Sequence, residues 1–224
     1  MTHSRLTIFA GHYGSGKTNL AINYAVMLKQ AHPDCRVILA DLDIVNPYFR
    51  SADSEDILNR MGIEVIASEY AGSNLEAPSI PSGVLSLFND ESCFGVIDVG
   101  GDDRGAYAIG RYSDNIRGKK ANILLVCNKY RPLSQEPRQV LSIKDEIENA
   151  AHICFTGIVN NSNLGRQTTP DDIISSGPYI NELSELCKLP VVYTVAMRAL
   201  TNNLSNIPGL FAIDIYGKKE WEID

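Results

Sequence analysis

The sequence lacks paired cysteines, long hydrophobic runs and an excess of basic residues, and each absence excludes a class of protein. Its five cysteines lie singly, with no C-x-x-C pair and no paired histidine nearby, at positions 35, 93, 127, 154 and 187. This spacing argues against a zinc site or a redox pair and indicates reduced thiols, as in cytosolic proteins. The chain is therefore expected to be cytoplasmic.

No hydrophobic run approaches the roughly 18 residues of a membrane span, and the apolar run Leu6–Ala10 is too short for a signal peptide. The 20 Lys and Arg residues against 27 Asp and Glu give a net charge of −7, which argues against a general nucleic-acid-binding protein. One local basic group is interpreted as a solvated surface: Arg111, Arg117, Lys119 and Lys120.

What the chain does contain is an alternation of short apolar runs with longer segments of helical spacing. The predicted strands are Leu6–Ala10, Arg36–Ala40, Glu64–Ala67, Phe94–Val99, Asn122–Cys127, His152–Val159 and Val191–Val195. The predicted helices are Lys17–Ala31, Ala52–Met61, Ser134–Ala150 and Tyr179–Cys187. This pattern is typical of βαβ units, and near-continuous apolar strands indicate a sheet covered on both faces. We expect one α/β domain over 1–224, a three-layer α/β/α sandwich with a mostly parallel sheet.

Two polar segments, Ala71–Gly83 and Asn160–Pro178, are predicted to be long loops. Loops of this length in compact domains are often functional. Both are therefore candidate walls of a ligand site.

A phosphate-binding motif follows the first predicted strand. Residues 11–18 read GHYGSGKT, which matches G-x-x-x-x-G-K-[ST] and leads directly into a predicted helix. Glycines let the backbone N–H groups point at phosphate oxygens, and the helix N-terminus adds its positive dipole end. Lys17 supplies a charge to the β and γ phosphates, and the Thr18 hydroxyl is placed to bind Mg²⁺. The predicted nucleotide-binding residues here are Gly11, His12, Tyr13, Gly14, Ser15, Gly16, Lys17, Thr18 and Asn19.

Three acids stand at the ends of two other predicted strands. Asp41 and Asp43 follow the strand that ends at Ala40, and Asp98 lies at the end of the apolar run from Phe94. Because the carboxyl ends of parallel strands gather at one edge of a sheet, these acids are expected near the phosphate-binding motif.

Together these motifs resemble the MinD/ParA-type branch (SIMIBI class) of P-loop ATPases, which also contains dethiobiotin synthetase and the nickel-insertion GTPases. The resemblance rests on GHYGSGKT, DLDIVNP, VIDVGG and GIVNN, which begin at residues 11, 41, 96 and 157. It implies that Asp41 and Asp98 hold Mg²⁺ through its waters, and that Asp43 orients or deprotonates the attacking water. The backbone N–H of Gly101 would sense the γ-phosphate.

Two residues depart from the family pattern. MinD and ParA proteins carry a lysine that reaches the nucleotide of a partner subunit; this chain has His12 at that position, followed by Tyr13 where the family has Gly. A neutral imidazole does not replace a permanent cation. A nucleotide-dependent homodimer therefore stays an open alternative, and a protein partner is expected.

The residues after the fifth predicted strand favour adenine over guanine. The nickel-insertion GTPases select guanine with N-K-x-D, in which the Asp accepts hydrogen bonds from the base; here the stretch reads Asn128-Lys129-Tyr130-Arg131. Arginine is a donor only. The resemblance implies that Asn161, or alternatively Asn160, contacts the base. The expected ligands are ATP or ADP with Mg²⁺.

The predicted function is Mg-ATP hydrolysis that drives a switch, with the loops Asp41–Arg50 and Asp98–Gly105 ordered by the γ-phosphate. Two alternatives stay open. One is an ATP-dependent metabolic enzyme similar to dethiobiotin synthetase, and the other is a GTPase metallochaperone.

The C-terminal segment bears on membrane binding. Leu210–Ile215, followed by Lys218 and Lys219, faintly resembles the membrane-targeting helix of MinD. The last residues, 220–224, read EWEID and would be repelled by anionic lipid. Membrane binding is therefore not expected.

Overall fold

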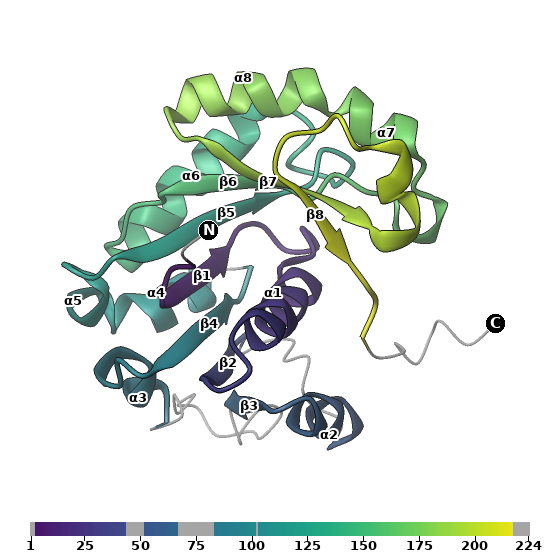
Figure 1. Ribbon diagram of the computed structural model, residues 1–224. Helices are drawn as coiled ribbons and strands as arrows, with labels where there is room; N and C mark the ends of the chain where they lie inside the picture. Colours follow the sequence, from purple (N-terminus) through teal and green to yellow (C-terminus); the bar gives the residue numbers. More distant parts are fainter. Residues whose placement is uncertain (1–2, 44–51, 67–82, 102, 217–224) are drawn as a thin grey trace.

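The computed structural model describes residues 3–43, 52–66, 83–101 and 103–216. Its centre is an eight-stranded sheet with the order β3-β2-β4-β1-β5-β6-β7-β8, in which every strand pairing is parallel (Figure 1). The strands are β1 Leu6–Ala10, β2 Arg36–Leu42, β3 Ile63–Ile66, β4 Cys93–Val99, β5 Ala121–Cys127, β6 Gly157–Asn160, β7 Val191–Met197 and β8 Leu210–Ile213. This order places β1 between β4 and β5, so the loop after β1 lies beside the ends of both.

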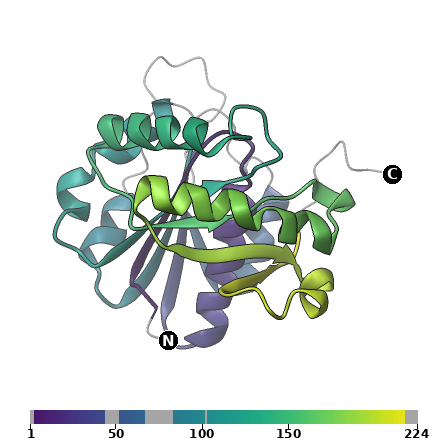
Figure 2. The same ribbon diagram turned by 90° about the horizontal axis from the view of Figure 1, so that it is seen from above.

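Helices cover both faces of the sheet (Figure 1, Figure 2). They are α1 Lys17–Ala31, α2 Ala52–Arg60, α3 Val84–Asn89, α4 Asp103–Gly110, α5 Ser113–Ile116, α6 Pro137–Ala151, α7 Pro170–Ser175 and α8 Gly177–Cys187, with 3-10 turns at Gly165–Gln167 and Arg198–Asn203. The apolar cluster on one face contains residues of α3, α4, α5, α6 and α8, and the cluster on the other contains residues of α1 and α2. The expected three-layer α/β sandwich is confirmed.

The strands supply alternate side chains to the two apolar clusters. In β1, Ile8 packs into the cluster under α6 and α8, whereas Phe9 packs against α1. All five residues of β1 are buried, which agrees with a parallel strand covered on both faces. The phosphate-binding loop therefore follows a strand that is buried along its whole length.

Two predictions about local structure were wrong. β6 begins at Gly157, not His152, because His152 ends α6 in a left-handed conformation with φ of 54°. The segment Asn160–Pro178 is not a continuous loop, because Pro170 follows a capping box between Thr169 and Asp172 that starts α7. The strand β8, at Leu210–Ile213, was not predicted.

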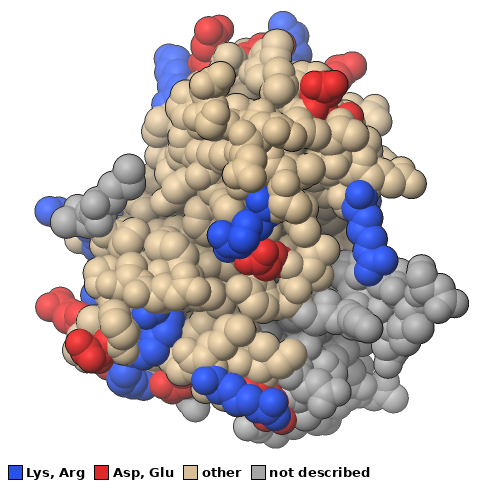
Figure 3. Space-filling model, turned by 45° about the vertical axis from the view of Figure 1, so that its right-hand side comes forward, with Lys and Arg blue, Asp and Glu red and all other residues tan. Residues whose placement is uncertain are grey.

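The short helices α3, α4, α5 and α7 were not predicted, because at four to eight residues they are too short for a helical period to stand out. Across the described residues, no helix combines the length and the apolar character that crossing a membrane requires. On the face shown in Figure 3, the described basic side chains are scattered among acidic and uncharged ones and form no continuous basic patch.

Candidate functional site

The phosphate-binding motif forms the turn between β1 and α1. β1 ends at Ala10 and α1 begins at Lys17, so residues 11–16 make the loop. Gly16 has a φ of 87°, a backbone conformation that favours glycine, and a β-carbon there would collide with the side-chain amide of Asn161. The N-terminus of α1 thus faces the edge of the sheet where the strands end.

Lys17 and Thr18 lie in the first turn of α1. Lys17 is only 6% exposed, and its Nζ donates a hydrogen bond of 3.1 Å to the carbonyl oxygen of His12. Thr18 Oγ1 donates to Asp98 Oδ2 over 2.5 Å. The helix that carries the loop is therefore tied to the end of β4. Asn19 follows them in α1, and its backbone oxygen accepts a hydrogen bond from Asn23.

The acids predicted at two strand ends lie on neighbouring strands. Asp41 of β2 and Asp98 of β4 are paired in register, and both are buried. The backbone N–H of Asp43 donates to Asp41 Oδ1 at 2.9 Å, which stabilises the chain as it leaves β2. The carboxylates come together beside the loop as strand order predicts.

Asp98 has an environment suited to a cation. Burial raises its pKa to about 6, although the charge of Lys17 and the hydrogen bond from Thr18 oppose the shift. Its Oδ1 is buried and has no hydrogen-bond partner among the described residues. A buried, unpartnered carboxylate oxygen beside a threonine hydroxyl fits a hard divalent cation such as Mg²⁺, which prefers oxygen ligands.

These acids do not form a closed metal cage. In the part of the chain that the structure describes, no group of three or more His, Cys, Asp or Glu side chains is arranged to hold a metal ion. Mg²⁺ usually keeps several waters and takes one or two protein carboxylates together with substrate phosphates. Thr18 and Asp98, with Asp41 next to them, therefore suit an ion that arrives with a phosphate ligand.

Gly101 lies directly against the phosphate-binding loop. A β-carbon at Gly101 would come within 2.5 Å of Tyr13 N and 2.9 Å of Lys17 Nζ. At the preceding Gly100, the corresponding position is 3.4 Å from Asp43 Oδ1. The backbone after β4 can lie this close to Tyr13 and Lys17 because Gly101 carries no side chain.

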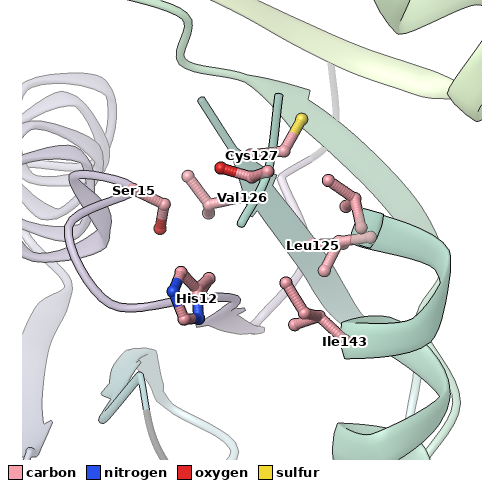
Figure 4. Close-up of a pocket in the computed structure, with 8 residues that line it drawn as sticks. His12, Ser15, Leu125, Val126, Cys127 and Ile143 are labelled. Atoms are coloured by element: carbon pink, nitrogen blue, oxygen red, sulfur yellow. The ribbon is translucent and has the colours of Figure 1, made fainter. Parts of the chain in front are cut away.

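The two residues that depart from the MinD/ParA pattern differ in exposure. His12 extends from the loop toward α6 and lines a small pocket with Ser15, Val126 and Ile143 (Figure 4). Burial, and then the charge of Lys17, lowers the pKa of His12, which keeps the imidazole neutral at neutral pH. Tyr13 is 64% exposed. His12 is thus packed within its own chain.

The other side of the loop is held by amide groups. Asn161 Nδ2 donates to the backbone oxygen of Ser15 at 2.7 Å, and Asn161 is 4% exposed. Asn160 Nδ2 donates instead to Ser176 Oγ at 2.8 Å. Of the two asparagines predicted to contact the base, only Asn161 reaches the loop, and the base contact itself stays a prediction.

Arg131, which in the sequence bears on base selection, lies close to Gly14. Its Cδ and Nε lie 3.9 Å from the position that a β-carbon would take at Gly14. The side chain therefore lies beside the phosphate-binding loop. The only signal in the sequence was its place shortly after an apolar strand, which does not predict this contact.

No protein-family model and no curated protein sequence matches the chain. Solved structures do match. Chloroplast FtsY from Physcomitrella patens is 17% identical with a TM-score of 0.55, over 87% of this chain and 59% of that one. FtsY from Thermotoga maritima is 20% identical with a TM-score of 0.54, over 85% of this chain and 61% of that one. FlhF complexed with GTP/Mg(2+) is 12% identical with a TM-score of 0.51, over 86% and 66%.

The chain has the P-loop NTPase fold. It spans about three fifths of the length of these FtsY structures. At such low identities the likeness concerns the fold, and it does not test the narrower resemblance to MinD and ParA. The P-loop NTPase fold agrees with the position of the loop, which follows the central strand β1.

Some predicted features fall on other parts of the chain. Most of the first switch loop, residues 44–50, and most of the loop Ala71–Gly83 lie outside the described residues. The same holds for Asp102 in the second switch loop and for Lys218, Lys219 and the acidic C-terminal end. The described site therefore comprises the phosphate-binding loop and the ends of β2, β4, β5 and β6.

Proposed function

We propose that this chain binds a Mg²⁺–nucleoside triphosphate at the loop between β1 and α1 and hydrolyses it. The observation that carries the proposal is Asp98, which accepts a hydrogen bond from Thr18 with one carboxylate oxygen while the other is buried and has no described partner. The names of two similar structures support it: one is FlhF with GTP/Mg(2+), and another is FtsY from Elizabethkingia anophelis with GDP.

Each polar group has a defined role in the proposed reaction. Lys17 and the N–H groups of residues 11–18 would bind the phosphates and stabilise the charge that develops on the γ-phosphate. Thr18 and Asp98, with Asp41, would hold Mg²⁺, which when bound neutralises charge on the β and γ phosphates. Asp43 would orient the attacking water, and the N–H of Gly101 would bind the γ-phosphate.

We propose ATP rather than GTP as the nucleotide. The basis is that position 131, where N-K-x-D GTPases carry the aspartate that accepts hydrogen bonds from guanine, holds an arginine, which can only donate hydrogen bonds. Parallel affinity measurements with ATP and GTP test this choice. Tighter binding of GTP would favour the metallochaperone alternative.

The proposed output is a nucleotide-controlled switch that another protein reads. Asp43 and Gly101 belong to the two predicted switch loops; Gly101 lies against Tyr13 and Lys17, and Asp43 lies beside Gly100. Because His12 packs toward α6 in its own chain, we propose that its side chain does not reach the nucleotide of a second copy. Size measurements with ADP and with ATP test for a nucleotide-dependent homodimer.

The decisive experiment replaces the phosphate-binding lysine. We expect K17A to lose nucleotide affinity by more than about 100-fold, and to lose turnover, because it removes the charge aimed at the phosphates. Calorimetry and phosphate release measure the two effects, and circular dichroism checks that the fold survives. K120A, which removes an exposed lysine before β5, is the matched control. Unchanged turnover in K17A would refute the proposal.

A further inference from the structure

The segment that carries Arg131 is anchored at its other three residues. The side-chain oxygen of Asn128 accepts the backbone N–H of Tyr130 at 3.0 Å. Lys129 Nζ and the Tyr130 hydroxyl donate to backbone oxygens within 172–175, over 3.2 and 2.8 Å. Three consecutive side chains are thus fixed away from the phosphate-binding loop, and Arg131 is the one that lies beside it.

Arg131 occupies a defined position relative to the loop. Its Cδ and Nε lie 3.9 Å from the β-carbon position at Gly14, and Gly14 is a loop residue whose backbone would approach the phosphates. The side chain is exposed, and its guanidinium forms no ion pair within the described part of the chain. A permanent cation is therefore available at the rim of the phosphate site.

The two cations beside the loop, Lys17 and Arg131, lie on different sides of it. Lys17 Nζ lies near Gly101 and acts on the pKa of Asp98, on the side of the acids. Arg131 comes from the end of β5, on the side where Asn161 bonds Ser15. His12 contributes no permanent charge, because burial lowers its pKa.

We infer that Arg131 binds the phosphate chain of the nucleotide, from within the same subunit and from the side opposite the acids. This inference rests on the proposed function and adds to it a second phosphate-binding cation. A guanidinium can donate two parallel hydrogen bonds to phosphate oxygens. Because the contact is with phosphate, it does not depend on the base.

The test compares R131Q with the wild-type chain, using two probes. One is ATP and the other is inorganic tripolyphosphate, which has no base or sugar, both with Mg²⁺ and at fixed salt. We expect R131Q to weaken binding of both by about tenfold, because each loses one charge-assisted hydrogen-bonding group. R131K keeps the charge but cannot donate two parallel hydrogen bonds, so its affinity is expected to lie between those of R131Q and the wild type. R138Q removes an exposed arginine in the first turn of α6 and should change neither affinity by more than about twofold.

Three other results would have distinct meanings. Equal affinities of R131Q and wild type for both probes would overturn the inference. Weaker ATP binding with unchanged tripolyphosphate binding would also overturn it, and would assign Arg131 to the base or sugar. If the wild-type chain binds neither probe, the proposed function itself fails.

Discussion

The two sides of the phosphate-binding loop are built differently. On one side, β2 and β4 bring carboxylates and glycine backbone to the loop, and the contacts are made by residues at the strand ends themselves. On the other side, the loops after β5 and β6 bring an amide and an arginine to the phosphate-binding loop: Asn161 donates to the backbone oxygen of Ser15, and the Arg131 side chain lies near Gly14. We call the first the acid side (Asp41, Asp98 and Gly101) and the second the amide side (Asn161 and Arg131). The acid side suits a metal ion and the reacting phosphate. The amide side suits rigid support of the loop and of the rest of the nucleotide.

Of the variants that test this difference, D98N on the acid side is expected to have the largest effect. Turnover should fall by about 100-fold or more, because the buried carboxylate would no longer hold Mg²⁺. Stability should not fall, because burial already disfavours the charged form and asparagine keeps an oxygen for the Thr18 hydroxyl. Phosphate release and thermal unfolding measure the two effects.

D114N is the matched control for D98N. Asp114 in α5 has a side chain that is 91% exposed and a surface ion pair with Arg117, so turnover and stability should both stay near wild type. A D98N variant that turns over normally would show that the acid side of the loop does not hold the metal.

The amide side can be disrupted through the glycines that it contacts. Gly14 and Gly16 both have positive φ, 75° and 87°, so alanine at either position should cost about 1 kcal/mol of unfolding free energy. G16A should cost more, and should bind nucleotide more weakly, because its β-carbon would also meet the amide of Asn161, whereas at Gly14 the nearest atoms are at 3.9 Å. Denaturant unfolding and calorimetry give both quantities.

A double-mutant cycle tests the cause of that difference. Once N161A has removed the amide, G16A should cost less than it does alone, so the two effects should not add. Additive effects would mean that contact with the Asn161 amide is not the reason why G16A costs more than G14A.

The sequence predicted the relative positions of Asp41 and Asp98 but not the position of Arg131, for a physical reason. The acids follow apolar strands, and the rule that parallel strand ends share an edge brings Asp41 and Asp98 together without further information. Arg131 lies beside Gly14 on a segment whose Lys129 and Tyr130 side chains bond to residues more than 40 positions later. Contacts of that kind depend on tertiary packing, which leaves no periodic pattern in the sequence.

The same distinction applies to the fold. The bounds of β1 and α1 match the predicted ones, because an apolar run and a helical period are local signals. β8 was missed because its four residues form a strand only through pairing with β7. The side chains of β8 also depend on other elements for their contacts: Phe211 packs near Tyr193 of β7 and Tyr24 of α1.

The smallest effect is expected at His12, which lines a pocket with residues of β5 and α6. Its imidazole lies toward α6 (Figure 4), and its pKa is lowered, first by burial and then by Lys17. At pH 7.5 it is therefore neutral, and H12Q should change ATP affinity by no more than about twofold. Because the folded chain binds this proton more weakly than the unfolded chain, His12 adds stability above its unfolded pKa and loses it as the pH falls below that value. Wild type should thus lose more stability than H12Q between pH 7 and pH 5 in thermal unfolding. A large loss of ATP affinity in H12Q at pH 7.5 would instead place the imidazole on the phosphates.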